Sequence, residues 1–108
     1  MWIYTTDGFY SVVHDRYCEP DELMIRARKR EDLERLNAYN IKGDIIELPH
    51  ADYRYRIPVK RAIWSKYLTQ YAQNLRYNNF KNTLPPQDHS RHEAYYKCWE
   101  AMYTFQRS

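Results

Sequence analysis

Glycine is scarce in this sequence, with only Gly8 and Gly43 among 108 residues. Glycine-rich phosphate-binding loops and the GxSxG nucleophile motif both need closely spaced glycines, so the sequence excludes these two kinds of site. Cysteine is equally scarce. Cys18 and Cys98 do not have the paired spacing of a zinc site or of a disulfide framework. We therefore expect two free thiols in a reducing compartment, the cytoplasm.

Long hydrophobic runs are also absent. No apolar stretch approaches the roughly 20 residues that a membrane helix needs. Met1 is followed directly by Trp2 and Ile3, without the basic and apolar regions of a signal peptide. These absences predict a soluble protein that is not exported and has no membrane partner. A length of 108 residues, 44% of them hydrophobic, favours a single domain over residues 1–108.

Two residue types are unevenly distributed or overrepresented. The segment from Tyr53 to Lys66 contains five basic residues and no acidic one, although the whole chain carries a net charge of only +3. Tyrosine occurs twelve times. Its ring gives contact area at low conformational cost, and its hydroxyl group tolerates water, so this surplus favours a recognition function.

Alternation of apolar and polar residues predicts the strands, and apolar residues at helical spacing predict the helices. Residues 2–5 and 9–14 form a predicted hairpin, in which the pair Asp7 and Gly8 supplies the positive φ of a tight turn. Further predicted strands are residues 23–28, 44–48 and 53–59. Predicted helices are residues 31–39, with their exit at Gly43, residues 63–75, and a last helix that starts with a capping box at residues 90–93. Pro58 indicates a sheet edge or the end of pairing.

The same periodicities predict the core. In the third strand, Leu23, Ile25 and Ala27 should face inward, opposite Arg26 and Arg28. The predicted inward residues of the strand 53–59 are Tyr53, Tyr55, Ile57 and Val59. The predicted buried stripes of the two long helices are Ile63, Trp64, Tyr67, Leu68, Tyr71, Ala72 and Leu75, and Tyr95, Cys98, Trp99, Met102 and Phe105. The predicted fold is therefore α+β, an antiparallel sheet of about five short strands with helices packed on one face.

Several short motifs occur together along the chain. They are WIYTTDGFYSVV at residues 2–13, IRARKREDLERL at 25–36, DYRYR at 52–56, YNNFK at 77–81, and a last helix with Tyr95 and Trp99. In these motifs the sequence resembles a family of short bacterial hypothetical proteins of about one hundred residues. The resemblance implies one compact domain and implies no activity. The stretch with Pro85 and Pro86 departs from it.

Four arginines make the leading candidate site. Arg26 and Arg28 on one predicted strand, and Arg54 and Arg56 on another, should project from the sheet face opposite the core. Guanidinium groups bind phosphate oxygens in a bidentate way, and nearby tyrosines can stack on bases. This pattern favours a non-enzymatic module that binds single-stranded nucleic acid or another polyanion. Further basic residues that could assist are Lys60, Arg61 and Lys81. Alternatively, the arginines pair with acidic residues on a solvated face.

A protein-interaction module is the second reading, for example an inhibitor from a phage or another mobile element that binds a host enzyme. Tyr96 and Tyr103 lie seven residues apart, away from the predicted buried stripe of the last helix, and are the candidate contact residues. The acidic loop at residues 15–22 could contribute to such a contact. The sequence indicates no particular oligomeric state.

Catalytic and metal sites are poorly supported. His50 with Asp52 and Tyr53 is the only compact set that offers a base, a carboxylate and a hydroxyl group. His89 and His92 stand at helical spacing, but nothing supplies the four ligands of a structural zinc site. His14 with Cys18 meets the same objection. We therefore expect no catalytic residue, no metal and no cofactor.

Overall fold

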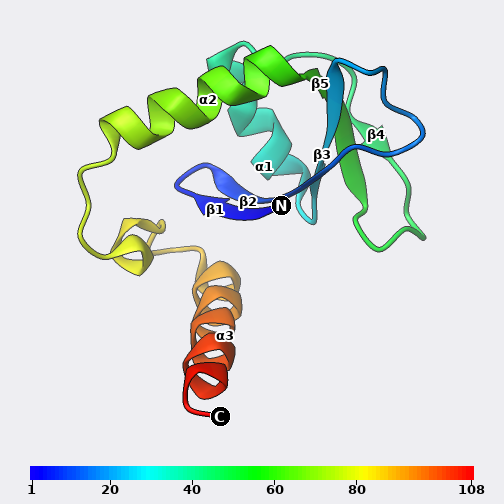
Figure 1. Cartoon of the computed structure of the whole chain (residues 1–108). Helices are drawn as coiled ribbons and strands as arrows, with labels where there is room; N and C mark the ends of the chain where they lie inside the picture. Colours follow the sequence, from blue (N-terminus) through cyan, green and yellow to red (C-terminus); the bar gives the residue numbers. More distant parts are fainter. The chain divides into compact units, whose positions relative to one another are not determined.

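The computed structural model describes residues 1–108 and divides into two compact units, Met1–Leu75 and Arg76–Ser108. The first unit contains a β-sheet with two α-helices, and the second contains a short 3-10 helix and one long α-helix (Figure 1). No helix combines the length and the apolar character that a membrane span requires.

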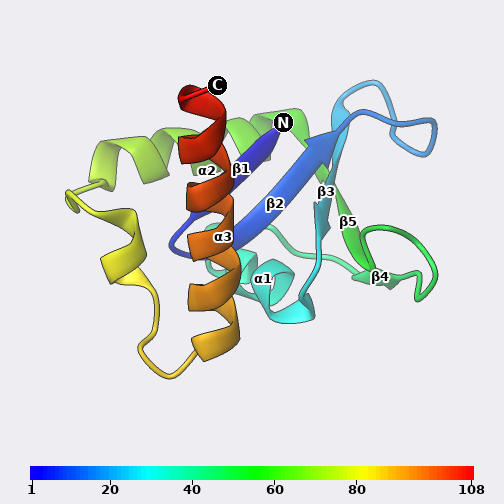
Figure 2. The ribbon, with the colours of Figure 1, turned by 90° about the horizontal axis from the view of Figure 1, so that it is seen from below.

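The first unit is built on five antiparallel strands in the order β1-β2-β3-β5-β4. They are β1 (Trp2–Thr5), β2 (Gly8–Val13), β3 (Glu22–Ala27), β4 (Ile46–Glu47) and β5 (Tyr55–Lys60). Figure 2 shows β1, β2, β3 and β5 side by side. The short edge strand β4 pairs with β5 only at Arg56 and Tyr55. At Pro58, β5 therefore pairs with β3 on one side and has no partner strand on the other. This is the edge position that was predicted for Pro58.

Two helices cover one face of this sheet. They are α1 (Arg30–Arg35), which continues as the 3-10 helix η1 (Leu36–Tyr39), and α2 (Arg61–Asn74). Both α-helices contact β3 and β5, and in Figure 1 both lie above the β1–β2 hairpin. This arrangement confirms the predicted α+β fold. Trp64 of α2 is 2% exposed and its ring packs edge-on against Tyr10 of β2. The end of the predicted α2 stripe is exposed, at Ala72 and Leu75.

The β1–β2 hairpin forms as predicted, but Gly8 has a different role. Thr5 pairs with Gly8, so the turn consists of Thr6 and Asp7, and Gly8 is already the first residue of β2. A Cβ atom at Gly8 would lie 2.4 Å from the Cγ atom of Asp32. Glycine is therefore required because the side chain of Asp32 approaches the hairpin closely.

The first helix also ends differently from the prediction. Asn40, not Gly43, is the C-cap of η1, with a left-handed backbone at a φ of 65°. Asparagine tolerates this conformation because its short polar side chain can form local hydrogen bonds.

Tyr53 is buried, but on the sheet face opposite the predicted one. β5 begins at Tyr55, so Tyr53 lies in the bend before the strand. Its ring lies near Phe9 and against Arg26, two residues of the sheet face opposite the helices. Pleating determines the side of a residue only inside a strand, which is why the alternation does not hold for Tyr53.

The second unit consists of η2 (Phe80–Thr83) and α3 (His89–Gln106). Asp88 is the N-cap of α3, and its side chain accepts a hydrogen bond of 3.2 Å from the backbone N–H of Arg91. The N-cap therefore lies two residues before the start of the predicted capping box at residues 90–93, and that prediction is wrong. The guanidinium group of Arg91 donates to Asp88 and holds the pKa of that carboxyl below its ordinary value.

Most of the predicted buried stripe of α3 is exposed. Tyr95 is buried, but Trp99 is 48% exposed, so the prediction of Trp99 as a core residue is wrong. Cys98, Met102 and Phe105 are exposed as well. Helical spacing predicts which side of a helix is apolar, but not whether another element covers it. In this unit, η2 packs Phe80 against Tyr95 near the beginning of α3, with ring centroids 6.0 Å apart.

Candidate nucleic-acid interface

Two arginine side chains meet on the ring of Tyr53. The Cζ atom of Arg28 lies 4.2 Å from the ring centroid, and that of Arg26 lies 4.6 Å from it. Cation–π contacts are worth about 0.5–1 kcal/mol at exposed sites and about 2 kcal/mol or more when desolvated. Because Tyr53 is only 4% exposed, its ring is a well-fixed support for both groups. Tyr53 therefore holds two positive charges in one small area of the sheet face opposite the helices.

Arg56 brings a third positive charge to this area. It is the direct partner of Arg26 across β3 and β5, so the two side chains project from the same face. Its Nη2 donates a hydrogen bond of 3.0 Å to the carbonyl oxygen of Tyr53, while its Nε is buried without a hydrogen-bond partner. We call Arg26, Arg28 and Arg56 the arginine cluster.

The charges of Arg26 and Arg56 are not neutralised by acidic residues. Neither side chain takes part in an ion pair. Arg26 instead donates to Ser11, with 2.6 Å between Nη2 and the hydroxyl oxygen. Like charges directly opposite each other destabilise a sheet, so packing alone gives no reason for this pair.

One acid does approach the arginine cluster. A carboxylate oxygen of Asp52 lies 3.4 Å from Nη1 of Arg28, and the carbonyl oxygen of Asp52 accepts a hydrogen bond of 3.0 Å from the same atom. Both side chains are more than half exposed. Exposed pairs of this kind contribute at most about 1 kcal/mol. The alternative expectation, that acids pair with the arginines, therefore describes Arg28 but not the other two.

Arg54 lies apart from the arginine cluster. Its Nε is 3.6 Å from a carboxylate oxygen of Glu47, and its Cζ lies 5.7 Å from the ring centroid of Tyr55. Arg54 precedes the first residue of β5, so strand alternation does not determine its direction, as for Tyr53. The structure thus brings together three of the four predicted arginines.

The remaining predicted cations have other neighbours. Lys60 forms an ion pair of 3.0 Å with Asp21, a contact that raises the pKa of the lysine above its ordinary value. Arg61 donates a hydrogen bond of 3.1 Å to the carbonyl oxygen of Pro20. Both residues therefore hold the loop between β2 and β3. Lys81 belongs to the second unit.

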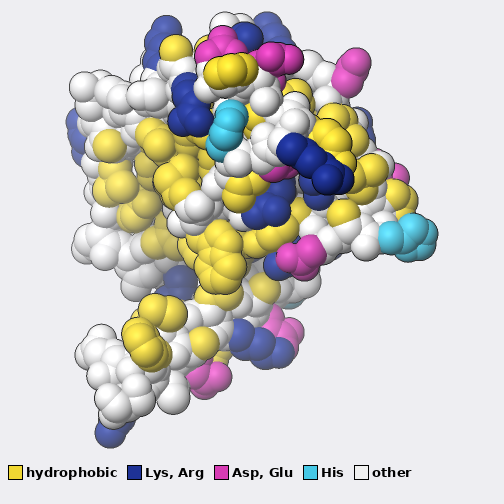
Figure 3. Space-filling view, turned by 45° about the vertical axis from the view of Figure 1, so that its right-hand side comes forward, with side chains coloured by type: hydrophobic (Ala, Val, Ile, Leu, Met, Phe, Trp, Pro, Cys, Tyr) yellow, Lys and Arg dark blue, Asp and Glu magenta, His cyan; other side chains and the backbone are white.

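Aromatic side chains lie on the same sheet face as the arginine cluster. The rings of Tyr4 and Phe9 stack with centroids 4.5 Å apart, and Trp2 contacts Phe9 edge-on at 6.4 Å. We call Trp2, Tyr4 and Phe9 the aromatic row. In the sequence, Trp2, Tyr4 and Phe9 alternate with the inward residues Ile3 and Tyr10, and this alternation could have identified the row. A search for basic or tyrosine-rich segments does not find it. Figure 3 turns the side of β3, β4 and β5 toward the viewer, and there Lys and Arg side chains adjoin hydrophobic surface.

Asp32 of α1 is a buried charged residue of the first unit, at 2% exposure. One carboxylate oxygen accepts from the backbone N–H of Phe9, and the other accepts from Arg35, each at 3.1 Å. The hydroxyl group of Tyr10 donates to the carbonyl oxygen of Asp32 at 2.8 Å. These bonds connect helix α1 to the hairpin, which is a structural function.

The hairpin turn is held from α2 as well. The hydroxyl group of Tyr67 donates to the carboxylate of Asp7 at 2.7 Å and lies 2.8 Å from the hydroxyl oxygen of Thr5. Burial raises the pKa of the Tyr67 and Tyr10 phenols well above their ordinary values. Both tyrosines therefore remain neutral hydrogen-bonding groups of the core.

The second unit exposes an aromatic stripe on α3, formed by Tyr96, Trp99 and Tyr103. Successive ring centroids lie 5.8 and 5.2 Å apart, and Nζ of Lys81 lies 4.6 Å from the centroid of Trp99. All three rings are between 44% and 49% exposed. The stripe contains both predicted contact tyrosines and adds Trp99 between them.

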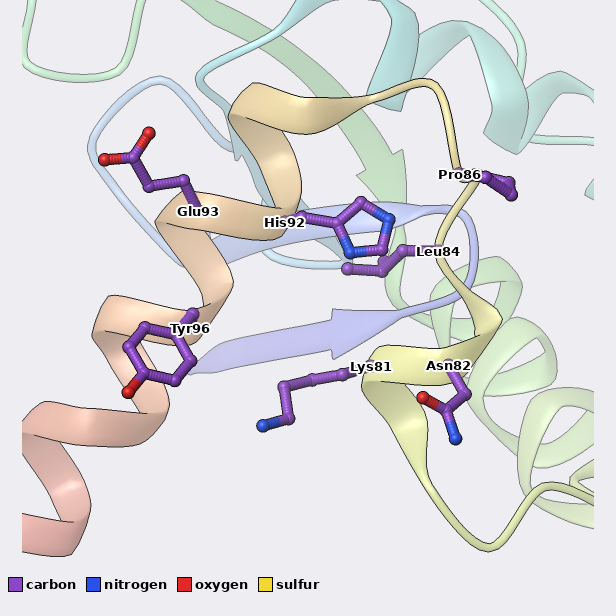
Figure 4. Close-up of a pocket in the computed structure, with 7 residues that line it drawn as sticks. All are labelled: Lys81, Asn82, Leu84, Pro86, His92, Glu93 and Tyr96. Carbon is purple, nitrogen blue, oxygen red and sulfur yellow. The ribbon is translucent and has the colours of Figure 1, made fainter.

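A shallow pocket of about 720 Å³ lies beside this stripe. It is lined by Lys81, Asn82, Leu84, Pro86, His92, Glu93 and Tyr96. In Figure 4, Lys81 extends toward helix α3, which carries Tyr96. Glu93 lies on the same helix, and its side chain points away from Lys81. His92 contacts the carbonyl oxygen of Pro85 at 3.0 Å. The lining offers a cation and an aromatic ring, but no set of groups in a catalytic arrangement.

The one compact set of a base, a carboxylate and a hydroxyl group in the sequence, at His50, Asp52 and Tyr53, does not converge. His50 is exposed, Asp52 pairs with Arg28, and the ring of Tyr53 contacts two arginines. These three side chains therefore have separate environments, and none of their contacts links a base to a hydroxyl group.

The structure contains no group of three or more His, Cys, Asp or Glu side chains that could hold a metal ion. In the first unit, His14 contacts the carbonyl oxygen of Glu22 at 2.9 Å, and the thiol of Cys18 contacts Asp15 at 3.5 Å.

Comparisons of the chain with protein-family models, with curated proteins and with solved structures found no match. The resemblance to a family of short bacterial proteins therefore stays a prediction.

Proposed function

We propose that the protein is a small, non-enzymatic cytoplasmic module that binds nucleic acid or another polyanion through the arginine cluster. One observation carries this proposal: Arg26 and Arg56 are direct cross-strand partners, and neither has an acidic partner. A phosphate group between them would neutralise both charges and accept hydrogen bonds from both guanidinium groups.

Preorganisation supports the same proposal. Arg26 is held by Ser11, Arg56 by the carbonyl oxygen of Tyr53, and Arg28 by the Tyr53 ring. Side chains that are already fixed lose less conformational entropy on binding. The cluster lies on the sheet face opposite α1 and α2. A chain ligand explains why three cations are spread over two strands better than a single small anion does.

The test is a binding titration with a labelled single-stranded oligonucleotide and with heparin, at about 50 mM salt. Wild-type protein should bind both, and Arg26→Ala or Arg56→Ala should each weaken binding by about tenfold or more, because hydrogen bonds to charged groups contribute about 1.5–3 kcal/mol. Lys66→Ala is the matched control, since Lys66 is an exposed cation of α2 outside the cluster. Equal weakening by all three substitutions would reject a specific role of the cluster.

The second candidate is a protein-interaction module, such as an inhibitor of a host enzyme carried by a mobile element. The exposed stripe of Tyr96, Trp99 and Tyr103 favours it, because aromatic side chains dominate protein interfaces. The acidic loop at residues 15–22 could contact a basic partner, although Asp21 is paired with Lys60. For this function, Tyr96→Ala or Tyr103→Ala should abolish capture of the partner, and Arg26→Ala should leave it unchanged.

A further inference from the structure

We propose that the ligand of the arginine cluster is a single-stranded nucleic acid, and that one of its unpaired bases stacks on Trp2 while its phosphates contact Arg26 and Arg56. This inference rests on the proposed function and makes it more specific. It assigns a role to Trp2, an aromatic residue that is not needed for the core.

The strand register places these three residues in one line. Trp2 is the partner of Ser11, Ser11 is the partner of Arg26, and Arg26 is the partner of Arg56. Directly paired residues in antiparallel strands project from the same face, so the line runs across β1, β2, β3 and β5 on the face opposite the helices. Three spacings between strands correspond to about 14 Å. One end of the line is an aromatic ring and the other is cationic.

Trp2 has the surface that stacking requires. Its side chain is 73% exposed, although tryptophan is normally mostly buried. Phe9, stacked on Tyr4, contacts the Trp2 ring edge-on and supports it. A supported but uncovered indole ring on the same sheet face as cations is the combination that sequence-tolerant single-strand binders use.

The width of the face argues for a single strand and against duplex DNA. The major groove is about 12 Å wide and admits an α-helix or a two-stranded ribbon. The line from Trp2 to Arg56 crosses four strands, which is wider than the two-stranded ribbon that the major groove admits. In a duplex, moreover, both faces of each base are covered by neighbouring base pairs. Unpaired bases can be splayed out onto a sheet, and sheet faces of this kind stack about two or three of them.

The test compares two labelled oligomers of equal length, oligothymidylate and an abasic single strand that keeps the phosphates and lacks the bases. Wild-type protein should bind oligothymidylate more tightly than the abasic strand by about five- to a hundredfold, which corresponds to one stacked base. Trp2→Ala should remove this difference and leave the affinity for the abasic strand unchanged, and Trp2→Phe should restore part of it. Tyr17→Ala is the control, because Tyr17 is 66% exposed in the loop between β2 and β3.

The outcomes separate this inference from the proposed function. If both oligomers bind equally to wild type, and Arg26→Ala weakens both, the stacking of a base on Trp2 is rejected while polyanion binding stands. A difference between the oligomers that persists in Trp2→Ala also rejects it. If neither oligomer binds but heparin does, the inference fails and polyanion binding stands; if heparin does not bind either, both proposals fail. Tighter binding of a matched duplex than of either single strand would contradict the assignment of the ligand class.

Discussion

Arg26 and Arg56 face each other as direct partners across β3 and β5, and the sheet supplies no acid to either of them. Two guanidinium groups in this position repel each other, so a bound anion should stabilise the folded protein. The proposed function assigns this anion to the phosphates of a nucleic acid.

The first prediction follows from this linkage. A single-stranded oligonucleotide at a concentration of one hundred times its Kd should stabilise the native state by about 2.7 kcal/mol. For a domain of this size, this amounts to an increase in Tm of about 10 °C or more, measured by thermal denaturation. The double variant Arg26→Ala, Arg56→Ala should lose most of the increase. An equal increase in Tm for the variant and the wild type would contradict the assignment of the cluster.

The second prediction compares two tryptophans. Trp64→Ala should lower the free energy of unfolding by about 3–5 kcal/mol, because Trp64 is 2% exposed in the core. Trp99→Ala should lower it by less than about 1 kcal/mol, because the Trp99 side chain is 48% exposed. Urea denaturation measures both. Similar losses for the two variants would mean that Trp99 is packed in solution.

The third prediction concerns two aspartates. Asp32 is buried and ion-paired at 3.1 Å with Arg35, whereas Asp52 is exposed and lies 3.4 Å from Arg28. Asp32→Ala should cost about 3–5 kcal/mol of stability, and Asp52→Ala about 1 kcal/mol or less. Asp52→Ala should also tighten oligonucleotide binding slightly, because it removes the only acid beside the arginine cluster. Weaker binding by this variant would argue that Asp52 positions Arg28 for the ligand.

The fourth prediction concerns alkaline pH. Burial raises the pKa of Tyr10 and Tyr67 above the ordinary value of 10, so only the unfolded chain releases these protons near that pH. The stability contribution is therefore complete below pH 10 and is lost as the pH rises. Once the unfolded chain is fully ionised, above about pH 11, the free energy of unfolding should fall by about 1.4 kcal/mol per pH unit for each of the two tyrosines. Tyr67→Phe should make this fall less steep, by about half a proton at pH 10 and close to one proton at pH 11, in denaturation curves measured at those pH values, and an unchanged slope would contradict the assignment.

The sequence predicted the sheet well because alternation is a local property of each strand. Arg26, Ile25 and Ile57 lie on the expected faces, and Pro58 lies at the expected kind of position. The predictions were wrong where a residue lies just outside an element. Tyr53 in the bend before β5 is the clearest case, because its side is determined by packing on Arg26 and not by pleating.

The candidate site was predicted only in part, for a related reason. Register between strands decides that Arg26 is opposite Arg56 and that Trp2 belongs to the same line, and register depends on the lengths of the turns. Arg54 is two residues from Arg56, the spacing of two residues on one face of a strand, but it lies before β5. Its side chain forms an ion pair with Glu47 of β4. For α3, the apolar stripe in the sequence could not show whether another element packs over Trp99.

The most direct test of the central claim is the salt dependence of affinity for a single-stranded oligonucleotide. Each phosphate contact contributes a slope of about −0.7 to the plot of log K against log salt concentration, so three arginines predict a slope of about −2. The variant Arg26→Ala, Arg56→Ala should flatten this slope by about one to two units. Arg54→Ala should leave it nearly unchanged, because that side chain lies beside Glu47. No binding by wild type at about 50 mM salt, or the same slope in wild type and double variant, would contradict the account.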